Sequence, residues 1–269
     1  MAEGVEIPYV EHGPATAPCV VLIHGLGDSW RSYELVLRHL AHDARALVPS
    51  MRGHGEADRP DSGYAVADFA ADVVALLDEA GVGAAVIGGH SSASFVAQHL
   101  AAAYPERVSG LVLIGAPGSL KDHPGTRDLD AVFAAMTDPI DPAFVRGFTE
   151  GLVAGPVPSD FLDAQVNEVL KVPARVVRET WAGVRDFDPS GVVGRITVPT
   201  LVVWGDADGV PVASRDVQDA LIQSIPRAQL VVYSGVGHCP HWERPGRFAA
   251  DLVAFVQRAT MGTPIVPSD

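Results

Sequence analysis

The chain has little cysteine, since Cys19 and Cys239 are the only two among its 269 residues. They form no C-x-x-C pair, so the sequence does not imply a disulfide scaffold. It also lacks an apolar run of the roughly 18 residues that a membrane helix requires. The N-terminus has neither the basic region nor the apolar region of a signal peptide. These absences predict a protein of the reducing cytoplasm without a membrane span.

Positive charge is scarce as well. The 19 Lys and Arg residues are outnumbered by 33 Asp and Glu residues, which gives a formal net charge of −14. Nucleic acids and anionic membranes both select for clusters of Lys and Arg, and the sequence contains no such cluster. Neither partner is therefore expected, and the acidity is interpreted as a contribution to solubility. A small molecule is the predicted partner, with a homo-oligomer left open.

Three sequence patterns of cofactor sites are absent too. The chain contains no HExxH zinc pattern, no GxxxxGK[ST] phosphate loop and no GxGxxG dinucleotide turn. We therefore expect a functional site without a metal and without a cofactor.

Apolar residues make up 48% of the chain and charged residues 19%, which is typical of a folded globular protein. Short runs rich in β-branched residues alternate with segments of helical spacing, and this alternation predicts parallel βαβ units. We expect an α/β fold, in which helices cover both faces of a mostly parallel central sheet of about eight strands. The opening segment 5–13 is expected to form an edge strand or a hairpin. The strand-like runs are 19–24, 45–50, 84–89, 110–116, 200–205 and 229–235, and the helical segments between them are 33–41, 66–81, 94–105, 215–225 and 244–259.

One region interrupts this alternation. Residues 119–188 contain no convincing strand, and Pro and Gly separate their helix-like segments. The region is too long for a simple crossover between two strands. We predict a helical lid over the carboxyl ends of the strands, where open α/β sheets bind their ligands. The core domain then comprises residues 1–118 and 189–269. A helical subdomain that serves only packing remains the alternative.

The heptapeptide GGHSSAS at 88–94 places three serines between a predicted strand and a predicted helix. A serine on such a sharp turn projects its hydroxyl from the edge of the sheet. The turn requires small residues two positions before and two positions after the serine. Only Ser91 meets this condition, with Gly89 before it and Ala93 after it. The alternative is that the serines cap the helix, as serine often does at a helix N-terminus.

Five segments of the chain resemble, in the expected order, the landmark motifs of the α/β-hydrolase superfamily in its serine-nucleophile branch. They cover essentially the whole chain outside the predicted lid. The resemblance implies the α/β-hydrolase fold and acyl transfer, because relatives that attack with a carboxylate carry it at the position of Ser91. The segments are HGLGDSW (24–30), RGHGEADRP (52–60), GHSSA (89–93), WGDAD (204–208) and GVGHCPHWERP (235–245).

The sequence departs from the usual motifs in the elbow and in the acid loop. Ala93 and Ser94 occupy positions where glycine is common, and alanine is small enough that the turn should survive. The segment DGVP (208–211) is one residue shorter than the corresponding D-x-x-V-P loop. This difference puts the placement of the acid in question.

The resemblance assigns a catalytic triad to the chain. His238 stands where the family's base histidine lies, in a glycine-bracketed loop before the last helix, and His241 is its competitor. The G-x-x-D pattern selects Asp208 as the acid, whereas Asp206 is expected to hold the loop. The order Ser91, Asp208, His238 agrees with the order of this fold.

The developing oxyanion of an acyl-transfer intermediate needs hydrogen-bond donors. The backbone N–H of Ser92 follows the nucleophile at a helix N-terminus and is well placed to donate. The resemblance implies that the backbone N–H of Leu26 is the second donor.

These features predict a serine hydrolase that cleaves an ester, a lactone or a related small carbonyl compound. A carbon–carbon bond hydrolase or a perhydrolase with the same triad is the alternative, followed by a ligand-binding receptor that retains the fold. For a carbon–carbon bond hydrolase we expect a cationic site, with Lys171, Arg175, Arg178 and Arg185 as candidates or as solvated helix faces. The predicted pocket residues, which in the alternative only pack the lid onto the core, are Trp30, Phe144, Phe148, Phe161 and Trp181.

Overall fold

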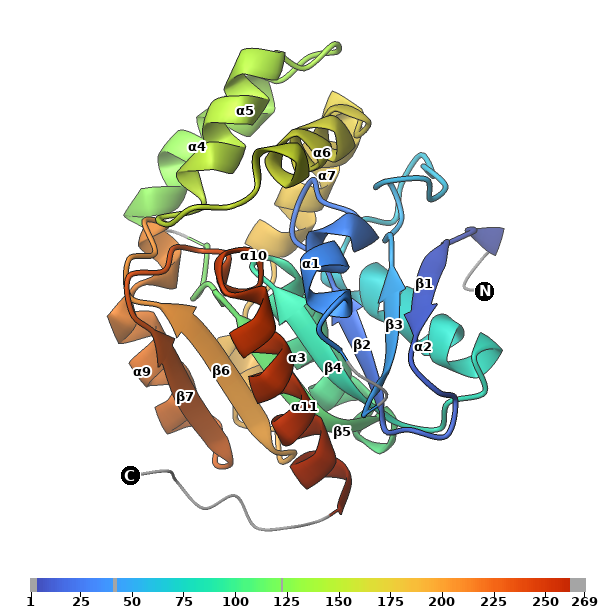
Figure 1. The fold of residues 1–269 in the computed structure, drawn as a ribbon. Helices are drawn as coiled ribbons and strands as arrows, with labels where there is room; N and C mark the ends of the chain where they lie inside the picture. The colour runs from blue at the N-terminus through green and yellow to red at the C-terminus, as the bar shows by residue number, and fades with distance from the viewer. Residues whose placement is uncertain (1–3, 41–42, 122, 262–269) are drawn as a thin grey trace.

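A computed structural model describes residues 4–40, 43–121 and 123–261 of the chain. Its strands form one seven-stranded sheet in the order β1-β3-β2-β4-β5-β6-β7 (Figure 1). This is one strand fewer than the sequence led us to expect. The strands are β1 (Tyr9–His12), β2 (Cys19–Ile23), β3 (Arg45–Pro49), β4 (Ala85–His90), β5 (Val108–Ile114), β6 (Thr200–Gly205) and β7 (Ala228–Tyr233).

The missing strand is explained at the start of the chain, where the described part of segment 5–13 forms the single edge strand β1 and no hairpin. Pro8 has no N–H to donate to a ladder, although its carbonyl accepts from Ser50 N at 2.9 Å. The ladder therefore begins at Tyr9, which pairs with Pro49 of β3 in antiparallel register. All other neighbouring strands are parallel.

Two apolar cores lie on the two faces of the sheet, because successive side chains of a strand point to opposite faces. Along β2, Val21 and Ile23 join one core, whereas Val20 and Leu22 join the other. The first core includes residues of α2, α3 and α9, and the second includes residues of α1 and α11 (Figure 1). The expected α/β architecture with helices on both faces is confirmed. These helices are α1 (Glu34–Leu37), α2 (Val66–Glu79), α3 (Ala93–Ala103), α9 (Arg215–Ser224) and α11 (Pro245–Met261).

The strand order reverses beside β2. The chain passes from β2 to β3 on one side of it and then returns to β4 on the other side. Ile23 and Gly89, near the carboxyl ends of β2 and β4, are paired in register. The loops that follow these two strands therefore emerge side by side, at the kind of switch point where open α/β sheets bind ligands.

Helices and loops fill the long connection between β5 and β6. Figure 1 shows α4 to α7 above the carboxyl ends of the strands, and the described residues of 119–188 contain no strand. The division into a core domain and a lid remains a prediction. Within these two regions, residues 1–3, 41–42, 122 and 262–269 lie outside the described residues. The connection contains the 3-10 turn Pro124–Thr126 and the helices α4 (Arg127–Ala135), α5 (Pro142–Gly151), α6 (Ser159–Leu170), α7 (Ala174–Arg185) and α8 (Ser190–Val193). Outside it lie α10 (Pro240–Glu243) and the 3-10 turns Trp30–Tyr33, Pro105–Arg107 and Pro211–Ala213.

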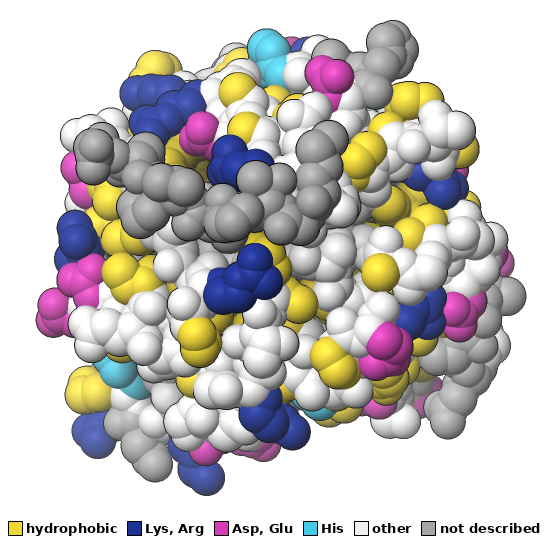
Figure 2. All heavy atoms as spheres, turned by 90° about the horizontal axis from the view of Figure 1, so that it is seen from below, with side chains coloured by type: hydrophobic (Ala, Val, Ile, Leu, Met, Phe, Trp, Pro, Cys, Tyr) yellow, Lys and Arg dark blue, Asp and Glu magenta, His cyan; other side chains and the backbone are white. Residues whose placement is uncertain are grey.

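The surface shows mixed charge. On the face away from α4 to α7, Lys and Arg side chains are dispersed among acidic, polar and apolar ones (Figure 2). No helix within the described ranges is both long enough and apolar enough to cross a membrane.

Candidate active site

Ser91 occupies a strained turn between β4 and α3. Its φ angle of 52° makes it the one non-glycine residue of the described chain with a positive φ. Its N–H donates to the Ile114 carbonyl at the end of β5, at 2.8 Å. A Cβ atom built at Gly89 would overlap the backbone carbonyl of Ala93. The turn therefore requires glycine two residues before Ser91, whereas it accommodates alanine two residues after it.

The two other serines of the heptapeptide have different surroundings. The buried Ser94 hydroxyl donates to the Gly89 carbonyl at 3.1 Å, across the turn. Ser92 is the N-cap residue of α3, but its side chain makes no capping hydrogen bond. Neither hydroxyl thus caps the helix, which leaves the capping interpretation without a hydrogen bond to support it.

His238 and Asp208 lie together at the carboxyl edge of the sheet. His238 Nδ1 is 2.8 Å from Asp208 Oδ2, and both side chains are almost completely buried. The second oxygen of Asp208 accepts from Val210 N at 2.9 Å, so the short DGVP loop holds its own carboxylate. Asp206 accepts instead from Gly235 N at 2.6 Å and joins the two loops.

The imidazole of His238 packs against the end of β5. A Cβ atom at Gly115, whose φ is 53°, would lie 3.1 Å from His238 Nδ1 and 2.9 Å from its carbonyl oxygen. Gly115 directly follows Ile114, which accepts the Ser91 N–H. Asp208, His238 and Ser91 are thereby gathered around one strand end. The Ser91 hydroxyl makes no hydrogen bond to His238 in the described chain, and such bonds often tighten only when a substrate is present.

A buried polar cluster lies behind His238. His90 Nε2 is 3.1 Å from the His238 carbonyl, to which it can only donate, and His90 Nδ1 is 3.9 Å from Asp28 Oδ2. Ser32 donates to Asp28 at 3.2 Å and contacts His241 Nε2 at 3.1 Å. His241, the competitor of His238, therefore contacts Ser32 and not the acid Asp208.

Burial sets the protonation of this cluster. It raises the pKa of Asp28 to about 7, against the weaker lowering effect of the Ser32 hydroxyl. Burial likewise lowers the pKa of His241 to about 3 and that of His90 well below its usual value. Sequence reasoning missed Asp28 and His90 as supports of the histidine loop, although both lie inside the motifs that it used.

Glu243 of α10 fastens the loop that carries His238. Its Oε1 accepts from Gly237 N at 2.7 Å and from Ala154 N at 3.2 Å, while its Oε2 accepts from Gly155 N at 2.5 Å. The carboxylate thus joins the His238 loop to the segment after α5. The motif residue Glu243 gave no sign of this role in the sequence.

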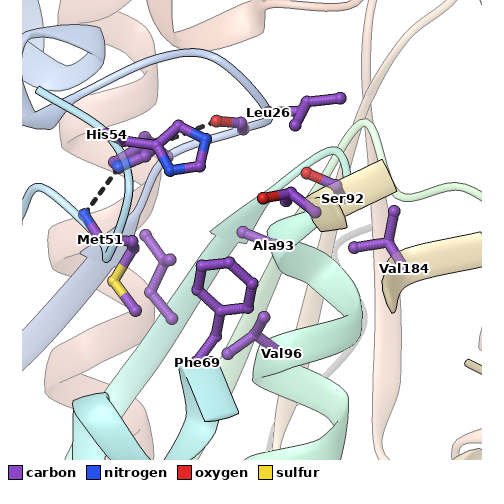
Figure 3. A pocket seen from close by; sticks show the side chains of 12 residues that line it. Leu26, Met51, His54, Phe69, Ser92, Ala93, Val96 and Val184 are labelled. Carbon is purple, nitrogen blue, oxygen red and sulfur yellow. Dashed lines mark hydrogen bonds between the residues drawn. The ribbon is translucent and has the colours of Figure 1, made fainter. Parts of the chain in front are cut away.

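Leu26 and Ser92 line the same cavity. The backbone N–H groups of these two residues donate to no other described residue, and their role as oxyanion donors stays a prediction. We call this space the inner cavity, and Figure 3 shows the side chains around it. It is lined by Ile23, His24, Gly25, Leu26, Met51, His54, Phe69, Ser92, Ala93, Val96, Thr180 and Val184.

A second space, the lid cavity, lies between the loop after β2 and helices α4 to α7. Phe144 and Phe148, two predicted pocket residues, line it with their rings 6.2 Å apart. All its walls are apolar side chains or glycine. It is lined by Leu26, Gly27, Phe133, Met136, Ile140, Phe144, Val145, Phe148, Val169 and Val177.

The other three predicted pocket residues line neither of these two cavities, so their place in a substrate pocket stays a prediction. The Trp181 indole donates to Asp130 at 2.6 Å and packs against Phe133, because a buried indole N–H needs a partner. Phe161 packs edge-on against Trp242 in a separate apolar cluster. Trp30 packs against the core that contains α11 and stacks with the neighbouring guanidinium.

Comparisons with known proteins address the family and the fold of the chain. The profile of the alpha/beta hydrolase family matches residues 20–251. A non-heme chloroperoxidase of Streptomyces lividans is 29% identical over 95% of this chain and 98% of its own. A 2-hydroxymuconate semialdehyde hydrolase of a Pseudomonas species is 29% identical over 89% of this chain and 87% of its own. The crystal structure of an esterase from a Rhodococcus species is similar with a TM-score of 0.81 and 28% identity, over 94% of this chain and 95% of that one.

The family match covers most of the chain, including every segment that forms the turn at Ser91 and the loops of Asp208 and His238. It also agrees with the mostly parallel sheet. The protein therefore belongs to the alpha/beta hydrolase family and is an enzyme of that family.

Proposed function

We propose that the protein is a serine hydrolase that cleaves an ester or a lactone through an acyl-enzyme on Ser91. The observation that carries this proposal is the grouping of a strained serine and a buried Asp–His pair. Ser91 has its φ of 52° after β4. Asp208 follows β6 and His238 follows β7, and both strands lie beyond β5 in the same parallel part of the sheet. This arrangement suits a nucleophile whose base is oriented by an acid.

The chemistry follows from the roles of the three side chains. His238 Nε2 takes the proton of Ser91 as Oγ attacks the carbonyl carbon, and Asp208 holds the ring through Nδ1. The N–H groups of Leu26 and Ser92 stabilise the oxyanion. The imidazolium then protonates the leaving oxygen, which departs. Water attacks the acyl-enzyme with His238 as base, releases the acid and restores the Ser91 hydroxyl.

The lid cavity indicates the character of one side of the substrate. Leu26 lines both this cavity and the inner cavity. A carbonyl held by the Leu26 N–H would therefore have one substituent directed toward the apolar lid cavity. Burial of apolar surface there would provide binding energy. We propose a neutral substrate with an apolar group on that side.

A carbon–carbon bond hydrolase is the second candidate, favoured by the similarity to the semialdehyde hydrolase. The four cations considered for its substrate carboxylate line neither cavity. Lys171 pairs with Glu56 and Glu168, and Arg178 donates to the Met136 carbonyl. Arg175 and Arg185 likewise have partners in Glu179 and Asp186. Their existing contacts make the ester or lactone the better proposal.

Perhydrolysis and ligand binding without turnover are the remaining candidates. The similarity to the chloroperoxidase keeps perhydrolysis in view as a further reaction of the same acyl-enzyme. A receptor would not need the strained turn and the buried Asp–His pair, so it is the least favoured candidate.

The test is hydrolysis of p-nitrophenyl butyrate by the native chain and by Ser91→Ala. We expect turnover by the native chain and a loss of at least about 10⁴-fold in kcat for the variant, because removal of a triad serine leaves only oxyanion and binding effects. A fluorophosphonate label should be found on Ser91 after peptide mapping.

Ser92→Ala and Ser94→Ala are the matched controls, and both should retain labelling at Ser91. A label on Ser92 or Ser94 would contradict the choice of serine alone. If a panel of esters, lactones and diketone acids gave no turnover and no serine was labelled, the hydrolase proposal would fail.

A further inference from the structure

The inner cavity contains two polar atoms that the proposed chemistry does not use. His54 Nε2 and Thr180 Oγ1 are buried and make no hydrogen bond within the described residues. Their side chains line this cavity and belong to residues only 2% and 4% exposed. Buried polar atoms are nearly always paired, because an unpaired one lowers stability. Two of them in one cavity indicate a partner that comes from outside the chain.

The contacts of His54 determine what its free nitrogen can do. Its Nδ1 is 2.9 Å from the Arg52 carbonyl, which only accepts, so Nδ1 carries the hydrogen. Burial lowers the pKa of His54 to about 4, so the ring is neutral near pH 7. Nε2 is therefore a lone-pair acceptor. The Thr180 hydroxyl can donate as well as accept.

The cavity that contains these two atoms also extends to the two residues proposed as oxyanion donors. Leu26 and Ser92, the proposed oxyanion donors, form part of its wall, and Figure 3 shows the His54 ring across the cavity from Ser92. Helix α7 contributes to both cavities, with Val177 in the lid cavity and Thr180 in the inner cavity. A carbonyl at Leu26 thus has an apolar space on one side and a space with two polar atoms on the other.

The remaining walls of the inner cavity select for a neutral group. Met51, Phe69, Val96 and Val184 are apolar, and no Lys, Arg, Asp or Glu is among the described residues that line the space. An ionised carboxylate or ammonium would be buried there without a counter-ion, which is costly. A hydroxyl can instead donate to one polar atom and accept from the other.

We propose that His54 and Thr180 form a subsite for a hydroxyl group on the substrate. The substrate is then a hydroxylated ester or lactone, with the hydroxyl on one arm of the carbonyl and an apolar group on the other. Its O–H donates to His54 Nε2, and its oxygen accepts from the Thr180 hydroxyl. This inference rests on the proposed ester hydrolysis.

The test compares pairs of esters in which a hydroxyl replaces a methyl of similar size. Ethyl 3-hydroxybutyrate and ethyl 3-methylbutyrate place the difference on the acyl arm. 2-Hydroxyethyl butyrate and propyl butyrate place it on the alcohol arm. For at least one pair, we expect native kcat/KM to favour the hydroxylated ester by about tenfold or more, because a site built for a hydroxyl leaves its polar groups unpaired with the analogue.

Thr180→Val should reduce this preference by about tenfold, since valine keeps the shape and removes the hydroxyl. His54→Asn should reduce it similarly, because its amide N–H can replace Nδ1–H toward the Arg52 carbonyl while the acceptor at Nε2 is lost. Thr180→Ser should keep the preference. Thr149→Val is the matched control, because the buried Thr149 hydroxyl donates to the Val145 carbonyl and lines neither cavity.

Thermal unfolding distinguishes a subsite from a structural role. Thr180→Val should melt at the same temperature as the native chain or higher, since it removes an unpaired buried hydroxyl. A decrease of more than about 4 °C would assign the hydroxyl to folding and overturn the inference.

The inference would also be overturned if the native chain and Thr180→Val showed the same preference for the hydroxylated ester in both pairs of esters. An ordered water would then be the partner of the two buried atoms. The inference is likewise overturned if Ser91 is labelled by a fluorophosphonate but none of the four esters is hydrolysed. If Ser91 is not labelled and no ester or lactone is cleaved, the proposed function itself has failed.

Discussion

At the scale of single residues, the candidate site contains two glycines whose surroundings leave no space for a side chain. The turn at Ser91 brings the backbone of Ala93 against Gly89, and the end of β5 brings Gly115 against His238. Strain at such positions is maintained by the structure around them. The departure from the usual motif falls at Ala93, where the turn has space for a methyl group.

Gly89→Ala tests this description of the turn. The added methyl would overlap the Ala93 carbonyl, which is backbone and cannot move aside as a flexible side chain would. We expect the turn to shift and kcat for p-nitrophenyl butyrate to fall about 100-fold, which is typical when a reacting group is misplaced by about 1 Å. Ala93→Gly is the control and should keep most of the activity. Full activity of Gly89→Ala would show that the turn is not so constrained.

At the scale of elements, hydrogen bonds connect helices α5 and α6 and the residues that follow them to the core at several points. Leu152 accepts from His238 N at 2.8 Å, and Gln165 of α6 donates to the Arg31 carbonyl at 3.2 Å. Lys171 reaches Glu56 at 2.7 Å. The most concentrated contact is Glu243, whose carboxylate accepts three backbone N–H groups. These bonds connect helices α5 and α6 to the loops that form the site.

Glu243→Ala should therefore weaken both stability and activity. The variant removes the carboxylate that accepts hydrogen bonds from three backbone N–H groups. We therefore expect the free energy of unfolding to fall by about 2–4 kcal/mol. The His238 loop should also lose its fixed position, which lowers kcat. Urea unfolding and ester hydrolysis would measure the two effects.

Glu150→Ala is the matched control for this prediction. Glu150 is an exposed glutamate of α5 that pairs with Arg146 across one helical turn. Pairs of this kind contribute little. Similar losses in the two variants would argue against a special role for Glu243.

At the scale of the whole molecule, the core contains several neutral histidines. Burial lowers the pKa of His24 and His241 to about 3 and that of His54 to about 4, and it lowers the pKa of His90 well below its usual range. Asp28 is the opposite case, since burial raises its pKa to about 7. The fold thus retains ionisable groups in their uncharged forms.

The chain should consequently lose stability in mild acid. Below about pH 6.5 the unfolded chain protonates these histidines and the folded chain does not. Each histidine therefore lowers the free energy of unfolding by about 1.4 kcal/mol per pH unit until its folded pKa is reached. Asp28 acts in the opposite direction, because between about pH 4 and pH 7 only the folded chain keeps its proton. The loss of unfolding free energy from four histidines is larger than the gain from one aspartate. The midpoint of urea unfolding should therefore be lower at pH 5 than at pH 7.

Two variants identify the source of this pH dependence. His24→Gln removes one titratable group, so the slope of the free energy of unfolding against pH should fall by the equivalent of about one proton. The fold should survive, because Gln can still accept from Met51 N, as His24 Nε2 does at 3.0 Å. His39→Gln, which makes the same substitution at an exposed histidine outside the buried group, is the matched control. Equal midpoints for the native chain at pH 5 and pH 7 would refute the prediction.

The sequence by itself determined the α/β architecture, because apolar runs separated by helical segments have few other ways to bury both faces of a sheet. It also selected Ser91 for the tight turn, since only that serine has small residues on both sides, and the resemblance directed attention to Asp208 and His238. The architecture and the choice of Ser91 rest on local spacing, which a chain displays directly.

Only the tertiary structure decided which aromatic side chains border a cavity. Phe144 and Phe161 have the same character in the sequence, yet one lines the lid cavity and the other packs against Trp242. The same holds for Glu243, and for His54 and Thr180, which meet in one cavity although they are far apart along the chain. Periodicity shows that a residue is buried, but the partner that it meets depends on how distant elements pack, and no local pattern encodes that packing.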